Sequence, residues 1–176
     1  MDQRVIVWFS CGAASAVAAK LAIDKYAERV VIAHCDTLAS EHPDNSRFFA
    51  DVRQWLGREI VTIRNGKYAT IDDVFEHRKY LAGNAGAPCT VELKKTPRFN
   101  FQLPDDLHVF GLTAEEKERI TKFENNNPEL RLDWILRDQG YNKKRCFHLL
   151  QDAGIRLPEI YSLGFENANC IGCVKA

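Results

Sequence analysis

The chain has 176 residues, of which 45% are hydrophobic and 27% are charged, a composition typical of a globular domain with a full hydrophobic core. Its 24 basic and 24 acidic side chains balance to a formal net charge of zero, which argues against broad electrostatic binding to nucleic acid. No apolar run approaches the roughly 18–20 residues of a membrane span, and no secretory signal precedes the first predicted strand. We therefore expect a single cytoplasmic domain over residues 1–176, without membrane contact.

Short apolar runs of strand length alternate with stretches in which apolar residues recur at helical spacing. The predicted strands cover residues 4–9, 30–34, 59–63 and 107–110. The predicted helices cover residues 15–26, 45–56, 71–77, 113–124, 134–140 and 143–153. This repeated alternation predicts an α/β fold, with a parallel sheet flanked by helices.

Several polar side chains stand where helices are expected to begin. Asp44, Asp133 and Asn142 are predicted N-caps, because a short polar side chain can accept a hydrogen bond from the first free N–H groups of a helix. Thr113 and Glu116 have the spacing of a capping box.

The stretch "SCGAAS", residues 10–15, joins the first predicted strand to the first predicted helix. Backbone N–H groups at the start of a helix favour an anion, Gly12 lets the backbone approach closely, and Ser10 and Ser15 add hydroxyl donors. The loop contains no Lys, Arg or Asp and is not a Walker A loop. A phosphate site and a plain tight turn capped by Ser15 both remain open on this pattern.

Ligands of parallel α/β sheets bind beyond the carboxyl ends of the strands. The loops at residues 10–15, 36–44 and 111–116 are therefore expected to meet at one edge of the sheet. Asp36, at the end of the second predicted strand, is expected to face this crevice.

Six cysteines in a cytosolic chain indicate metal, redox chemistry or buried thiols rather than disulfides. Cys170 and Cys173 form a Cys-x-x-Cys pair, which alone fits half of a zinc site, a redox pair or half of a cluster site. Cys35 is expected in the core. Cys11, at the start of a helix, is either a reactive thiol or a small side chain tolerated in a tight loop.

Six segments match a known family in the order in which the family has them: FSCGAAS, HCDT, HPDN, CTVELKKTP, GLTAEEKER and LPEIYSLGFENANCIGC. In these segments the chain resembles the phosphoadenosine phosphosulfate (PAPS) reductases, within the superfamily of the N-type ATP pyrophosphatases. The resemblance runs from residue 5 to residue 173. It implies an adenine nucleotide alpha hydrolase-like (PP-loop) fold with strand order 3-2-1-4-5 and an irregular, Cys-containing C-terminal segment. The fifth strand has no visible signal in the sequence.

The resemblance implies an adenine nucleotide, ATP or PAPS, as ligand. The residues that match the family's nucleotide site, or lie near it, are Ser10, Gly12, Ser15, Asp36, Thr37, Lys94 and Arg119. Arg119 has two possible roles, because it can reach a phosphate or pair with Glu115 one helical turn away.

The resemblance also implies a [4Fe–4S] cluster, in which Cys89 joins Cys170 and Cys173. The family's fourth ligand is a second cysteine beside the first, where this chain has Thr90. Cys146 is the candidate for the missing thiolate. If Cys146 lies elsewhere, three cysteines leave one iron open for a sulfide or a substrate. A zinc site has the same cysteine spacing and stays an alternative.

Some residues depart from the family pattern. Cys11, Ala14 and Leu112 replace a glycine, an aspartate and an arginine, and the chain ends without the catalytic cysteine that the reductases carry beyond Cys173.

One hypothesis is an iron–sulfur enzyme of sulfur transfer or sulfonucleotide reduction, served by a sulfur-donor or thiol-reductant protein. The other is a catalytically degenerate nucleotide-binding module that acts through a partner. Related branches insert sulfur into nucleic acids, a substrate that the neutral charge does not favour, and a homo-oligomer is possible.

Overall fold

A five-stranded, all-parallel sheet forms the centre of the computed structural model, which describes residues 3–84 and 86–174. The strands are β1 (Val5–Trp8), β2 (Val30–Cys35), β3 (Ile60–Ile63), β4 (Leu107–Phe110) and β5 (Arg131–Asp133). Their order in the sheet is β3-β2-β1-β4-β5. The predicted α/β class and the predicted strand order are both confirmed.

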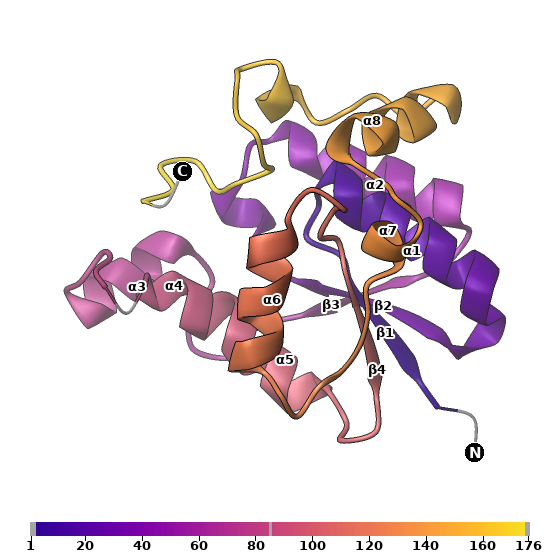
Figure 1. Cartoon of the computed structure of the whole chain (residues 1–176). Coiled ribbons are helices and arrows are strands. Elements are labelled where there is room, and N and C mark those ends of the chain that lie inside the picture. The colour runs from indigo at the N-terminus through magenta and orange to yellow at the C-terminus, as the bar shows by residue number, and fades with distance from the viewer. Residues whose placement is uncertain (1–2, 85, 175–176) are drawn as a thin grey trace.

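Helices cover both faces of the sheet (Figure 1). The longer helices are α1 (Ala13–Tyr26), α2 (Asp44–Leu56), α3 (Ile71–Arg78), α6 (Lys117–Asn126) and α8 (Lys143–Asp152). The shorter ones are α4 (Pro88–Thr90), α5 (Thr96–Phe101) and α7 (Ile135–Asp138), with a π-helical turn, Val91–Lys95, between α4 and α5. Single 3₁₀ turns occur at Ala27–Arg29, Leu38–Ser40 and Glu159–Tyr161. None of the helices in the described part of the chain has the length and apolar character needed to cross a bilayer.

The alternation of side chains along β1 explains the two layers of helices. Val5 and Val7 belong to the main core, which α1, α2 and α8 cover, whereas Ile6 and Trp8 face Phe101 of α5 on the other side. All four residues of β1 are buried, as expected for a strand in the middle of a parallel sheet.

The N-terminus of α1 is packed tightly against the loop that follows β4. A Cβ added at Gly111 would come within 2.5 Å of the Ser15 Cα atom, so only glycine fits this approach. The first loop and the loop after β4 are thereby held together at the carboxyl edge of the sheet.

The predicted helix starts are confirmed in part. Asn142 is the N-cap of α8, and its side chain accepts a hydrogen bond from the Arg145 N–H at 2.8 Å. The Thr113 N–H and hydroxyl both donate to the Glu116 carboxylate, but these contacts form a turn, and α6 begins only at Lys117.

Two predicted caps are wrong because longer-range partners take the carboxylates. Asp44 is the first residue inside α2 and binds Arg47 and the C-terminal segment. Asp133 ends β5, the strand without a visible signal, and accepts hydrogen bonds from Lys25 and Tyr26 of α1.

Candidate functional site

The first loop has a compact hydrogen-bonded structure at the carboxyl end of β1. The Ser15 hydroxyl donates to the Gly12 carbonyl at 2.9 Å and accepts from the Ser10 N–H at 3.1 Å. Ser15 is buried, whereas Ser10 is exposed beside it. Ser15 therefore maintains the shape of the loop, and Ser10 is the serine of the loop that is exposed to solvent.

Cys11 is a structural residue of this loop. Its backbone has a φ of 56°, in the left-handed region that favours glycine, the residue found here in the resembled family. The side chain is fully buried, and the thiol donates to the Asn45 carbonyl at 3.2 Å. Burial raises the pKa of the Cys11 thiol far above its usual value. Of the two sequence alternatives, the structure supports the tolerated small side chain.

The C-terminal segment runs back from α8 across the top of the view in Figure 1, toward the side where α3 and α4 lie. On its way, Tyr161 reaches the first loop, and its hydroxyl accepts a hydrogen bond from the Ala13 N–H at 3.1 Å. A Cβ added at Gly12 would lie 3.3 Å from the same hydroxyl oxygen and 3.8 Å from the Ala168 Cβ atom. The C-terminal segment thus lies directly against the predicted phosphate-binding loop.

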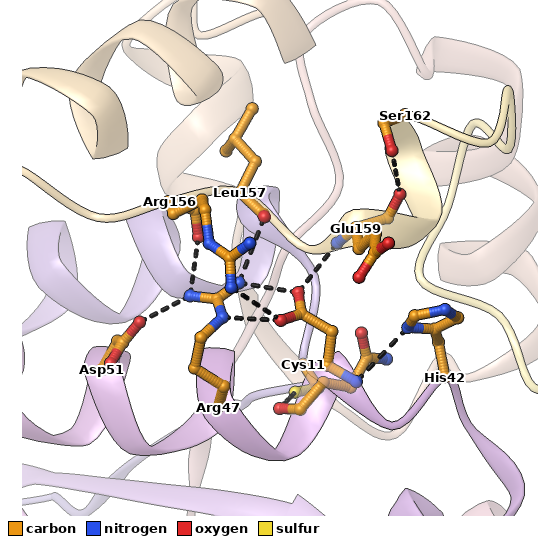
Figure 2. Close-up of polar contacts among 10 residues, drawn as sticks. Cys11, His42, Arg47, Asp51, Arg156, Leu157, Glu159 and Ser162 are labelled. Carbon is orange, nitrogen blue, oxygen red and sulfur yellow. Dashed lines mark hydrogen bonds and ion pairs between the residues drawn. The ribbon is translucent and has the colours of Figure 1, made fainter.

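Hydrogen bonds and the 3.1 Å ion pair between Arg156 and Asp44 anchor residues 156–161, here called the strap, to the start of α2 (Figure 2). The Arg47 guanidinium makes two 2.7 Å hydrogen bonds to the Asp44 carboxylate and donates to the carbonyls of Arg156 and Leu157. Asp44 also accepts from the Glu159 N–H at 2.9 Å. Because Arg47 stabilises the ionised carboxylate, the pKa of Asp44 is lowered to about 2.

Three cysteines from distant parts of the sequence line one pocket of about 60 Å³. Cys89 comes from α4, and Cys170 and Cys173 come from the C-terminal segment. Thr37 and Lys94 line the same pocket, which is called the thiol pocket below. Its three thiols are side chains of a type that can ligate a metal.

The backbone holds Cys170 against the loop that follows β2. Glu41 and Cys170 form an isolated antiparallel bridge, and the Ile171 N–H donates to the Ser40 carbonyl at 2.8 Å. The Cys173 N–H donates to the Cys170 carbonyl at 3.1 Å, closing a turn through Gly172, whose φ is 70°.

Burial keeps the Cys170 thiol protonated at neutral pH. It raises the pKa of Cys170 to about 11, and the nearby Lys94 opposes this effect only in part. Within residues 3–84 and 86–174, no group of three or more His, Cys, Asp or Glu side chains is arranged to hold a metal ion as it stands. A bound metal would have to draw the thiols together and displace their protons.

Cys146 does not line the thiol pocket. It is fully buried in the main core, where α8 packs on α1, and burial raises its pKa to about 12. The structure therefore brings together three of the four predicted ligands, and the predicted four-thiolate set is not assembled.

The other predicted site residues are spread along the same edge. Asp36 pairs with Arg64 at 2.6 Å, while Lys94 is exposed at the rim of the thiol pocket. The Thr37 side chain is buried at the base of the loop after β2. Arg119 pairs with Glu116 at 2.6 Å, in place of the expected Glu115.

A π-helical turn presents Lys94. Its widened backbone is braced by the Cys35 thiol, which donates to the Lys94 carbonyl at 3.5 Å, and by the Asn65 amide, which donates to the Glu92 carbonyl at 2.7 Å. Such turns within helices are frequent at functional sites. The turn places Lys94 in the same pocket as Cys89 of the preceding helix.

Sequence reasoning missed two buried residues that connect the thiol pocket to the first loop. The Glu41 carboxylate accepts from the Thr37 hydroxyl at 2.6 Å and from the Asn45 amide at 2.8 Å. Asn45 in turn accepts from the Cys11 thiol through its backbone carbonyl. The only available signal was position, because Glu41 directly precedes the "HPDN" segment and Asn45 is its last residue.

Neither protein-family models nor the curated proteins yield a match to this sequence. Among solved structures, the phosphate complex of PAPS reductase from Candida auris matches 97% of this chain and 82% of its own, with a TM-score of 0.69 and 11% identity. The chain has a PAPS reductase-like fold. The similarity in fold that the motifs predicted is confirmed, including the all-parallel sheet.

Proposed function

We propose that this protein binds an adenine nucleotide at the first loop, holds an iron–sulfur cluster in the thiol pocket, and acts in sulfur transfer or sulfonucleotide reduction. The observation that carries the proposal is the meeting of Cys89, Cys170 and Cys173 in one pocket. The pocket lies beside the first loop. A Cβ added at Gly12 would lie 3.8 Å from the Ala168 Cβ atom, and Ala168 precedes Cys170 by two residues. Both features stand at the carboxyl edge of the sheet, where such folds bind ligands.

The donor set fits a cluster with three protein thiolates. Cys89, Cys170 and Cys173 would hold it, and Lys94 at the rim would offset part of its negative charge. With Cys146 in the core, one iron would remain open. When bound, such a cluster would supply an iron that holds or polarises a sulfur species.

The side chains of this protein would position the nucleotide. The N–H groups at the start of α1 and the exposed Ser10 hydroxyl would bind a phosphate, as the helix dipole favours an anion there. Asp36 would contact the ribose, for which its ion pair with Arg64 would have to open. Electrons or sulfur would come from a thiol-reductant or sulfur-donor protein in the cytoplasm.

A specific observation favours the second candidate, a nucleotide-binding module without chemistry of its own. Leu112, which replaces an arginine of the resembled family, is buried against Ile120 and Trp134. The loop after β4 therefore offers no cation at this position for a phosphate or sulfate. In such a module the three cysteines would hold a structural zinc ion.

Replacement of Cys170 separates the two candidates. We expect anaerobically purified C170A to lose sulfite release from PAPS in the presence of a dithiol, and to keep its affinity for ATP and PAPS in calorimetric titrations. The control is C146A, which removes a thiol that lies in the main core and does not line the pocket. A C170A protein that turns over normally contradicts the enzyme proposal. A wild type that binds nucleotide and a single zinc ion but releases no sulfite supports the module.

A further inference from the structure

A backbone N–H group at the N-terminus of α1 already has a hydrogen-bond partner within the protein. The first N–H groups of a helix have no partner within the helix, and they are the groups that bind an anion. Of these, the Ala13 N–H donates to the Tyr161 hydroxyl at 3.1 Å. The hydroxyl oxygen also fills the space that Gly12 leaves, since an added Cβ would lie only 3.3 Å away. A phosphate oxygen that accepted from Ala13 would need the same position.

The strap that carries Tyr161 is fixed independently of the first loop. Arg47 donates to the carbonyls of Arg156 and Leu157 at 3.1 and 3.2 Å, and the Glu159 N–H donates to Asp44. These contacts, drawn in Figure 2, involve α2 and not α1. The strap therefore has its own anchor, and the Tyr161 hydroxyl is its point of contact with the loop.

An aromatic ring and a lysine ammonium surround the Tyr161 ring. The ring packs on Phe147 of α8, with 4.9 Å between the ring centroids, and the Lys143 ammonium lies 5.7 Å from the Tyr161 ring centroid. In the part of the chain that the structure describes, the ammonium of Lys143 forms no ion pair with a carboxylate within 4.0 Å. Lys143 therefore lies near the ring of the residue that reaches the first loop, and the loop itself contains no Lys or Arg.

We infer that the strap is an autoinhibitory contact, in which the Tyr161 hydroxyl occupies the anion position at the start of α1 and must leave before a phosphate group can bind there. The inference rests on the proposed nucleotide site. A phosphate competes well for this position, because it is charged and the phenol is neutral.

The test compares wild type with Tyr161→Phe, which removes the hydroxyl and preserves the ring packing. Inorganic phosphate and ATP are titrated into each protein, by calorimetry and by following the Ala13 amide resonance. We expect the dissociation constants of Y161F to fall about two- to tenfold, the worth of one hydrogen bond that no longer has to be broken. The Ala13 resonance should move with phosphate at lower concentration in Y161F than in wild type.

Two further variants complete the design. Asp44→Asn loosens the anchor without removing the hydroxyl, and it should give a smaller gain in phosphate affinity than Y161F. Tyr80→Phe makes the same chemical change at an exposed site and should change nothing.

The outcomes separate this inference from the proposed function. Y161F that binds phosphate and ATP with equal or lower affinity than wild type overturns the autoinhibitory contact, while ATP binding by wild type keeps the nucleotide site. Y161F that gains phosphate affinity but binds no adenine nucleotide keeps the contact and overturns the nucleotide site. No phosphate shift of the Ala13 resonance in either protein overturns the autoinhibitory contact.

Discussion

The two ends of the C-terminal segment are held in different ways. The strap is fixed by side chains, with Asp44 and Arg47 binding its backbone and Tyr161 reaching α1. Residues 169–174, here called the thiol stretch, are held by backbone hydrogen bonds to the loop after β2. Ile171 and Val174 of this stretch leave 58% and 40% of their surface exposed.

This difference indicates which part of the segment depends on a ligand. The strap satisfies its polar groups within the protein, and its conformation should not change when a metal is removed. The thiol stretch carries two of the three pocket cysteines, and we expect a bound cluster to supply contacts that the protein alone does not. The predictions below separate the two regions.

The largest expected effect concerns the thiol pocket, to which the thiol stretch contributes two of the three cysteines. Cys89→Ala should abolish iron binding, because a cluster with two remaining thiolates is not retained. Cys146→Ala should keep the iron, since Cys146 lies in the main core, and it should lower the free energy of unfolding by about 1–2 kcal/mol through lost packing. Iron content and urea unfolding measure the two effects. A C146A protein that folds but loses its iron would show that Cys146 is a ligand after all.

Arg47→Ala should break the strap. The variant leaves the Asp44 carboxylate without its main partner and two carbonyls without a donor, and we expect the free energy of unfolding to fall by about 2–3 kcal/mol. Limited proteolysis should cut within residues 156–161, while the iron content stays unchanged. The control is Arg53→Ala on the same helix, whose 3.9 Å pair with Glu59 is exposed and should contribute almost nothing.

Acid should loosen the strap through Asp44. Its pKa lies at about 2 in the folded protein and at the usual 3.8 when exposed, so the ionised carboxylate stabilises the fold above pH 4. This contribution, about 1–2 kcal/mol after discounting for solvent, is lost as the pH falls from about 4 to about 2. The difference in unfolding free energy between wild type and D44N should shrink over this range. A constant difference down to pH 2 would contradict the role of the ion pair.

Gly12→Ala gives the smallest expected effect. Its backbone, with φ −109° and ψ 159°, is open to any residue, so the only cost is the 3.3 Å approach of the new Cβ to the Tyr161 hydroxyl. We expect a loss of about 1 kcal/mol and a weakened hydrogen bond at Ala13, visible as a shift of its amide resonance. In the Y161F background the same substitution should cost less, and an equal cost there would mean that the hydroxyl is not the neighbour that matters.

Local patterns in the sequence predicted the architecture well. The apolar runs of β1 to β4 and the cap at Asn142 follow rules that operate over a few residues. β5 has only three residues and begins with the exposed Arg131, so it gives no apolar run to detect. Asp44 and Asp133 matched the local rule for caps, but partners 107–115 residues away in the sequence decide their roles.

Only those residues of the candidate site that belong to a recognisable sequence motif could be predicted. Spacing and resemblance led to Cys89, Cys170 and Cys173, which the structure brings to one pocket. Cys146 was the candidate that would complete a set of four thiolates, although its position beside the apolar residues of α8 also favoured burial, which is what the structure has. Tyr161 lies in a stretch without periodicity, and its contact with Ala13 spans 148 residues, so no local signal points to it.

The central claim is that the thiol pocket holds an iron–sulfur cluster. The most direct test is an assay of iron and acid-labile sulfide on wild-type protein purified without oxygen. The account predicts about four irons and four sulfides per chain, the content of a [4Fe–4S] cluster, with both lost in C89A. A folded protein without iron, and especially one with a single bound zinc, would contradict the cluster and favour the nucleotide-binding module.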